Sequence, residues 1–207
     1  MARAGVAARY EQILDPKVLE AFRRGLRRMN PGMLLIWRLG LGWTADLWPG
    51  GFGRLMVIEH VGRRSGARYR TPVNFTRDAG RVYCVVGFGP HTDWYRNVLA
   101  RPDIAVWLPD GRWSAHAEDA SDDPRRLHLM RKVLVDSGFA APLIGLHPRR
   151  LGDEDLDAAT ASYRLLRITP LWREDAPDGP GDLAWLWWPV GAVLVAGRLA
   201  RCVRRCR

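Results

Sequence analysis

Between residues 54 and 169 the chain is divided into short β-rich segments by glycine, proline and aspartate. Two turn signals, Asp78-Ala79-Gly80 and Pro109-Asp110-Gly111, separate neighbouring segments as in hairpins. Asp93 and Ser121 are expected to cap two inserted helices. The pattern predicts a mainly β, α+β fold, a small antiparallel barrel with flanking helices and not a doubly wound sheet. The expected strands are 54–61, 69–77, 81–87, 104–108, 112–118 and 163–169, the expected helices are 94–100, 124–135 and 153–162, and the barrel domain is 54–170.

Residues 1–53 form an N-terminal segment in this interpretation. Asp15 and Pro16 are a typical helix start, and apolar residues then recur at helical spacing beside a cluster of arginines. We expect this amphipathic helix to end near Asn30-Pro31. It can pack on the core or lie on a membrane surface, and the core is favoured. Residues 33–53, apolar and rich in tryptophan, are also expected to pack on the core.

The composition changes after Pro170. Residues 171–182 are rich in proline, glycine and aspartate and are expected to be a linker. Residues 183–197 carry no charge but contain three tryptophans, and five arginines follow them. The uncharged run is shorter than the ~17–25 residues of a spanning helix, and tryptophan beside arginine is typical of the surface of an anionic leaflet. We therefore expect residues 183–207 to be a re-entrant or in-plane anchor at the inner face of the cell membrane. The alternative is a tail packed on the barrel or in a homodimer interface.

The net charge of +10 indicates an anionic partner, such as a phosphorylated ligand, a lipid surface or nucleic acid. Nucleic acid is the least favoured, because half of the charge lies in the tail and no recognition motif is present. Three cysteines without a disulfide framework, and an N-terminus without a secretory signal, favour a cytoplasmic protein. The five histidines lack metal-ligand spacing, so no metal site is expected.

The chemistry is concentrated in residues 62–72, between the first two expected strands. This stretch holds four arginines, a serine and a threonine, and its glycines stand where a tight turn needs them. Such a turn can direct guanidinium and backbone N–H groups at one anion, most naturally a phosphate. A solvated hairpin tip is the alternative. A P-loop lysine and a nucleophile elbow are absent from the sequence, and Thr92 replaces the third glycine of a dinucleotide fingerprint after Gly87.

Four blocks together resemble the deazaflavin-dependent nitroreductase and quinone reductase family: residues 62–66, 69–74, 87–90 and 93–100, in the family's order. The similarity covers roughly residues 55–169. It implies a split β-barrel like that of flavin-binding pyridoxamine-phosphate-oxidase relatives. It also implies coenzyme F420, an 8-hydroxy-5-deazaflavin, whose phosphate and acidic tail are held by the basic turn.

The resemblance further implies which residues contact the cofactor. Four groups are carried over, namely the phosphate-binding turn, the strand along the cofactor, the strand end near the deazaflavin ring, and the helix start beside it. In that order they are Arg63, Arg64 and Ser65; Tyr69, Arg70, Thr71, Pro72, Val73 and Asn74; Val85, Val86, Gly87 and Phe88; and Asp93, Trp94, Tyr95, Arg96 and Asn97. For Trp94 and Tyr95, packing in the core is the alternative.

The implied activity is an oxidoreductase that transfers hydride from the reduced cofactor to a small electrophilic acceptor such as a quinone, an enone or a nitro compound. Tyr95, His91, His60 or water could supply the proton that the reduced product needs. Two alternatives stay open, an FMN-dependent reductase on the same barrel and a non-catalytic carrier of a cofactor or lipid.

Overall fold

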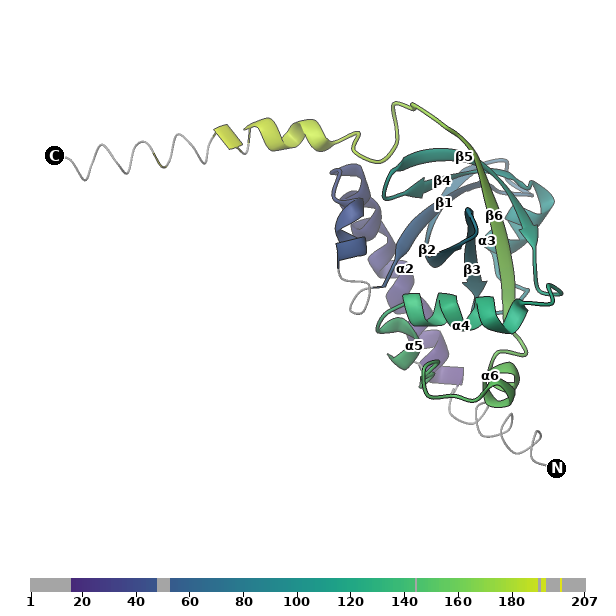
Figure 1. Cartoon of the computed structure of the whole chain (residues 1–207). Helices are drawn as coiled ribbons and strands as arrows, with labels where there is room; N and C mark the ends of the chain where they lie inside the picture. Colours follow the sequence, from purple (N-terminus) through teal and green to yellow (C-terminus); the bar gives the residue numbers. More distant parts are fainter. Residues whose placement is uncertain (1–15, 48–52, 144, 190, 193–197, 199–207) are drawn as a thin grey trace.

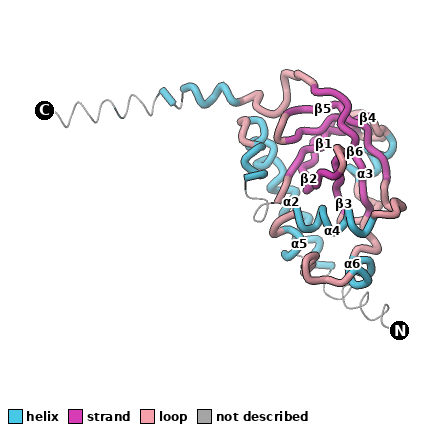
Figure 2. The backbone as a smooth tube through the Cα atoms, in the orientation of Figure 1, coloured by secondary structure: helices cyan, strands magenta, loops and turns pink. Residues whose placement is uncertain are grey.

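A computed structural model describes residues 16–47, 53–143, 145–189, 191–192 and 198 (Figure 1). Six antiparallel strands form a closed barrel in the order β1-β2-β3-β6-β5-β4, and helices lie around it (Figure 2). This confirms the predicted fold class. The strands are β1 (Leu55–Val61), β2 (Arg68–Asp78), β3 (Arg81–Val86), β4 (Asp103–Leu108), β5 (Gly111–Asp119) and β6 (Arg164–Arg173).

The main core fills the barrel, because alternate residues of each strand point inward and are apolar. Met56 and Ile58 of β1 lie in this core, whereas Val57 between them packs outside the barrel against Trp37 and Trp107. A further core lies between the outer face of β3 and β6 and the helices α4 (Arg126–Asp136), α5 (Ala140–Leu143) and α6 (Asp153–Ala159). The two sides of the sheet are thus both buried along β3 and β6.

The first described helix, α2 (Pro16–Arg38), is longer than the sequence predicted. It continues through Pro31, where we expected it to end, because its last turns are held by tertiary contacts. Trp37 is 4% exposed in the cluster outside β1, and the carbonyls of Trp37 and Arg38 accept hydrogen bonds from Gly181 and Leu183. A short 3₁₀ helix, η1 (Gly42–Leu47), follows it. The prediction that residues 33–53 pack on the core is confirmed for Trp37 and is wrong for Trp43, which is 49% exposed, while residues 48–52 lie outside the described part.

Two predicted helix caps are wrong. Thr92 stands at the N-cap of α3 (Asp93–Ala100), so Asp93 is the first residue of the helix. Helix α4 begins at Arg126 without a side-chain cap, because Ser121 is buried and its hydroxyl accepts a hydrogen bond from the backbone N–H of Leu165. Helix α6 ends at Ala159, before the predicted residue 162. Strand β6 continues to Arg173, beyond the predicted residue 169, because it pairs with β5 up to Trp113↔Arg173.

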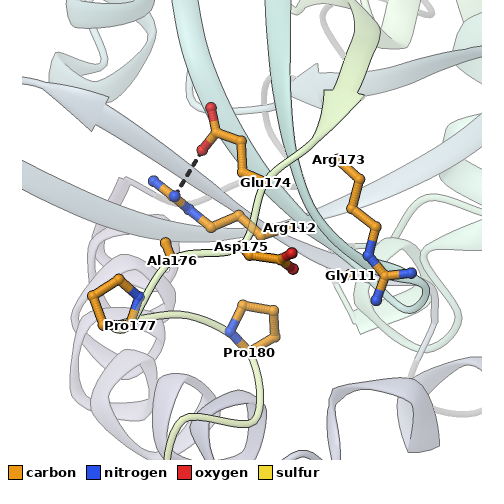
Figure 3. A pocket seen from close by; sticks show the side chains of 8 residues that line it. All are labelled: Gly111, Arg112, Arg173, Glu174, Asp175, Ala176, Pro177 and Pro180. Atoms are coloured by element: carbon orange, nitrogen blue, oxygen red, sulfur yellow. Dashed lines mark ion pairs between the residues drawn. The ribbon is translucent and has the colours of Figure 1, made fainter.

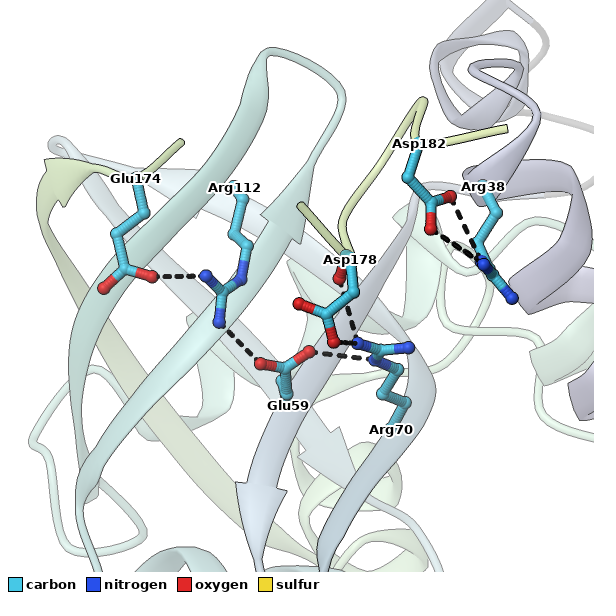
Figure 4. Close-up of polar contacts among 7 residues, drawn as sticks. All are labelled: Arg38, Glu59, Arg70, Arg112, Glu174, Asp178 and Asp182. Carbon is cyan, nitrogen blue, oxygen red and sulfur yellow. Dashed lines mark hydrogen bonds and ion pairs between the residues drawn. The ribbon is translucent and has the colours of Figure 1, made fainter. Parts of the chain in front are cut away.

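Residues 174–183, which we call the C-terminal strap, cross the outside of the barrel from the end of β6 to the end of α2 (Figure 1). Three arginines hold the strap through ion pairs: Arg112–Glu174 at 2.7 Å, Arg70–Asp178 at 2.6 Å and Arg38–Asp182 at 2.8 Å (Figure 4). Glu59, 6% exposed, pairs with both Arg70 (2.9 Å) and Arg112 (2.6 Å) beneath it. The predicted linker is therefore bound to the barrel and, at its end, to α2.

Beyond the strap, the described residues of the tail point away from the barrel (Figure 1). They include the 3₁₀ helix η2 (Ala184–Leu186) and three exposed tryptophans, Trp185 (61%), Trp187 (47%) and Trp188 (83%). In the part of the chain that the structure describes, none of the helices has the length and apolar character needed to cross a membrane. The division into 1–53, 54–170, 171–182 and 183–207 stays a prediction.

Candidate functional site

The basic turn joins β1 to β2 and closes on itself through the backbone. Gly62 N–H donates to the Ala67 carbonyl (2.8 Å), and Gly66 N–H donates to the Gly62 carbonyl (2.9 Å). Gly66 has a left-handed φ of +67°, and a Cβ on Gly62 would lie 2.5 Å from Ser65 Oγ. Gly66 is therefore required by the backbone of the turn, whereas a side chain at Gly62 would have to displace the Ser65 and Tyr69 side chains.

Arg63 fastens this turn to helix α3. Its Nη1 donates to Asn97 Oδ1 (2.8 Å), its Nη2 to Asp93 Oδ1 (2.9 Å), and its backbone N–H to Asn97 Oδ1 (3.2 Å). The hydrogen bond and the charge of Arg63 lower the pKa of Asp93, and the nearby Arg96 and Arg64 add to the effect. The structure thus brings the predicted turn and the predicted helix start together, with Arg63 as the link between them.

Three arginines around this junction project into solvent. Arg64 and Arg68 of the turn region and Arg96 of α3 are exposed, and none has a hydrogen bond or ion pair with another described residue. Ser65 Oγ lies beside them, accepts a hydrogen bond from Ala67 N–H (3.3 Å) and is 3.3 Å from the Tyr69 hydroxyl. Free guanidinium groups beside a folded turn form a surface that can bind an oxyanion.

Behind the turn lies a buried polar group. His60, 4% exposed, has Nε2 3.1 Å from Thr71 Oγ1 and Nδ1 3.4 Å from Asn97 Nδ2. Tyr69, half exposed, stacks on the imidazole with ring centroids 5.8 Å apart. Burial lowers the pKa of His60 to about 4, so the ring is neutral at pH 7.

Arg70 does not join the other arginines of the turn. It sits opposite Glu59 in the β1–β2 register, on the outer face of the barrel, and its guanidinium lies 4.8 Å from the centre of the Trp107 ring. Its Nε donates to Glu59 and its Nη2 to Asp178 (Figure 4). In the structure Arg70 is therefore part of the strap contacts.

The other predicted residues of β2 and β3 contribute mainly packing. Val73 packs against the barrel core and Asn74 Nδ2 donates to the Arg54 carbonyl (3.2 Å), while Pro72 faces Val57 across the β1–β2 pair. At the end of β3, Val86 lies inside the barrel and Val85 outside it, against the cluster of α4 and α6. The Cβ position of Gly87 is 3.9 Å from the Tyr163 ring.

Helix α2 reaches this end of β3 through Arg23, which the sequence did not single out. Its guanidinium lies 4.7 Å from the centre of the Phe88 ring, and Nη2 donates to the Phe88 carbonyl (3.1 Å). Only the helical spacing of the arginines in this segment could have hinted at such a contact.

The predicted aromatic pair on α3 is divided between two environments. Tyr95 is 3% exposed in the barrel core and its hydroxyl donates to Asp119 Oδ2 (2.6 Å). Burial, followed by the hydrogen bond to Asp119, raises the pKa of Tyr95. Trp94 is half-buried and edge-on to Tyr95, and His91 is exposed.

A separate shallow groove of about 330 Å³ lies at the opposite end of the barrel, where β5 begins and β6 ends. Arg112 and Arg173 flank it, with Asp175 and Pro180 of the strap between them (Figure 3). It contains none of the predicted site residues. Among the described residues there is no group of histidine, cysteine or carboxylate side chains that could hold a metal ion.

Comparison with known proteins identifies the chemistry of this barrel. Residues 42–141 match the family model of the F420H2-dependent quinone reductases. The chain is also 28% identical over 106 residues to Rv3178 of Mycobacterium tuberculosis, a protein named for F420H2-dependent quinone reduction; the match covers 45% of this chain and 89% of Rv3178.

Solved structures with a similar fold include an F420H2-dependent reductase, FDR-A (19% identity, TM-score 0.41, 55% of this chain and 92% of that chain). Another is the conserved protein Rv2991 of Mycobacterium tuberculosis (13% identity, TM-score 0.42, 62% and 79%). At these scores they add no weight to the assignment, which rests on the family model and Rv3178. Over residues 42–141, just under half of its length, the chain is similar to the F420H2-dependent quinone reductases, and it is an oxidoreductase that uses coenzyme F420.

Proposed function

We propose that the anionic end of coenzyme F420 binds at the junction of the basic turn with α3 and that the protein reduces a quinone-type small molecule there. The observation that carries this proposal is the set of exposed, unpaired arginines, Arg64, Arg68 and Arg96, beside the turn. Arg63 holds the turn on α3 and in this proposal acts as a support for the binding surface.

The hydrogen-bond donors around the basic turn fit the phosphate and acidic tail of coenzyme F420. A phosphate and an acidic tail need several cationic donors, and the turn offers them together with a hydroxyl on Ser65. A Cβ on Gly62 would lie 2.5 Å from Ser65 Oγ, so a side chain at this position would displace one of these donors. Arg70, predicted from the resemblance to share this role, would do so only after release from Asp178.

When bound, the reduced deazaflavin supplies a hydride, which is the difficult part of the chemistry. The protein residues bind and orient. Tyr69 and Trp94 offer partly exposed aromatic faces near the turn, and Phe88 is fixed by Arg23. We propose that the proton for the product comes from His91 or from water, because Tyr95 already donates to Asp119 and the imidazole of His60 is buried.

The experiment is a titration of the purified protein with oxidised coenzyme F420 and, in parallel, with FMN. Arg64→Ala, Arg68→Ala and Arg96→Ala should each weaken F420 binding by about 10- to 100-fold, the range for one hydrogen bond to a charged group. Arg101→Ala is the matched control, because it removes the same charge beyond the other end of α3 and should leave affinity unchanged.

Three results would contradict the proposal. Equal affinities in all four variants would remove the anion site from the turn. Binding of FMN in place of F420 would favour the flavin enzyme. Tight F420 binding without turnover of quinone, enone or nitro acceptors would favour a carrier.

We further propose that the tail contacts an anionic membrane surface, which would give a lipid-soluble quinone access to the enzyme. The support is the exposure of Trp185, Trp187 and Trp188, together with the arginines that follow them in the sequence. The full chain should sediment with vesicles of phosphatidylglycerol but not of phosphatidylcholine, and the double variant Trp185→Ser/Trp188→Ser should lose this binding. Sedimentation unchanged by the substitutions would refute the membrane contact. A homodimer interface on the same surface would appear as a dimer that the variant dissociates.

A further inference from the structure

A chain of hydrogen bonds runs from the basic turn into β2. It consists of Arg63, Asn97, His60 and Thr71, with successive contacts of 2.8, 3.4 and 3.1 Å between side-chain atoms. Asn97 and His60 are 6% and 4% exposed. The four residues come from the turn, α3, β1 and β2, so these hydrogen bonds connect four of the elements that meet at the candidate site.

The direction of each hydrogen bond follows from the chemistry of the partners. Arg63 has only donors, and two of its N–H groups point at Asn97 Oδ1, which must therefore be the oxygen of that amide. The amide nitrogen of Asn97 then faces His60 and donates to Nδ1. Nδ1 is consequently unprotonated, and the neutral ring carries its proton on Nε2 and donates it to Thr71 Oγ1.

The hydroxyl proton of Thr71 is available to donate a hydrogen bond in a fixed direction. Because Oγ1 accepts the hydrogen bond from His60, the Thr71 O–H must donate away from the imidazole, and none of the described residues accepts it. The Thr71 side chain is partly exposed, on the strand that adjoins the turn.

We propose that Thr71 is a hydrogen-bond donor to an oxygen atom of the bound cofactor, and that His60 and Asn97 are positioning residues that fix its orientation. This inference rests on the proposed function, since it places the cofactor beside β2. It adds a neutral, geometrically fixed contact to the charged contacts of the arginines.

The first test examines the chain of hydrogen bonds in the full-length protein without any ligand. Long-range ¹H–¹⁵N NMR of the histidine rings distinguishes the two nitrogens, and the signal missing from His60→Gln identifies His60. The expected spectrum at pH 7 has an unprotonated Nδ1 and a protonated Nε2. A proton on Nδ1 would overturn the inference whatever the cofactor is.

The second test is a double-mutant cycle on F420 affinity. Thr71→Val should weaken binding about three- to tenfold, the range for one neutral hydrogen bond, and Thr71→Ser should restore it. His60→Phe keeps a ring under Tyr69 but removes both nitrogens, and should cause a comparable loss. In the Thr71→Val background the same His60 substitution should have no further effect, because His60 acts through Thr71.

The outcomes separate this inference from the proposed function. Additive losses would mean that His60 has only a structural role, and wild-type affinity in Thr71→Val would remove Thr71 from the cofactor contacts; either overturns the inference. A change in KM for the acceptor with unchanged F420 affinity overturns it as well. The Arg64→Ala and Arg96→Ala variants test the anion site independently, so their result does not depend on the role of Thr71. If His60→Phe does not fold, the Thr71→Val and Thr71→Ser pair decides.

Discussion

Acidification from pH 7.5 to pH 5 should destabilise the native protein more than its His60→Gln variant, by about 2 kcal/mol. The ordinary pKa of histidine, 6.5, falls to about 4 for His60 because the ring is buried. The unfolded chain therefore takes up a proton first as the pH falls. The stability that His60 contributes is complete above pH 6.5 and is lost as the pH falls towards 4. A shift of this size is worth about 3 kcal/mol in total, of which about 2 kcal/mol is lost by pH 5.

The assay is urea unfolding followed by tryptophan fluorescence at several pH values between 5 and 7.5. Only the difference between wild type and His60→Gln matters, because the other titrating groups are common to both proteins. The difference in unfolding free energy should shrink steadily as the pH falls. Parallel curves for the two proteins would show that His60 takes up its proton as readily in the fold as outside it, and would refute the reasoning from burial.

Three further predictions concern stability. Glu59→Gln leaves two partly buried guanidinium groups without their carboxylate and should destabilise the fold by about 3–5 kcal/mol in urea unfolding. Asp110→Asn, in an exposed ion pair, is the control and should change stability by less than about 1 kcal/mol. Similar effects of the two substitutions would contradict the importance of burial. Gly25→Ala, on an exposed part of α2 with no atom within 4 Å of the new Cβ, should stabilise by about 0.5–1 kcal/mol, and a lower melting temperature would argue against a helix there. Gly62→Ala should destabilise by about 1–3 kcal/mol and weaken F420 binding, because its Cβ would collide with Ser65 Oγ; unaltered binding would mean that the turn can rearrange.

Local sequence chemistry was sufficient to predict the strands and their connections. Asp78-Ala79-Gly80 forms the β2–β3 turn with φ of +47° at Ala79 and +76° at Gly80, and the glycines of the basic turn have the roles that their spacing indicated. The signals at such positions depend on a few neighbouring residues, so a single sequence contains them. The continuation of α2 through Pro31 depends instead on the burial of Trp37 and on contacts with a distant segment, which no local pattern contains.

The candidate site was predictable as a location but not in the roles of its arginines. Four arginines within residues 62–72 look equivalent in the sequence. In the fold, Arg63 is engaged by α3, Arg70 faces Glu59 because of the β1–β2 register, and Arg64 and Arg68 stay free. Residue alternation along β2 could have separated Arg70 from Tyr69, since neighbours point to opposite faces, but the partner Asp178 lies 108 positions away.

The strap has a consequence for the order of folding events. Arg38 and Asp182, which it joins, are 144 positions apart, and its other partners stand on β2 and β5. Because these partners lie on the closed barrel and on the docked α2, we expect the strap contacts to form late in folding. Interactions formed after the transition state slow unfolding and leave the folding rate nearly unchanged. We therefore expect the strap to slow unfolding, so that Asp182→Asn should shorten the lifetime of the native protein while refolding proceeds at the wild-type rate.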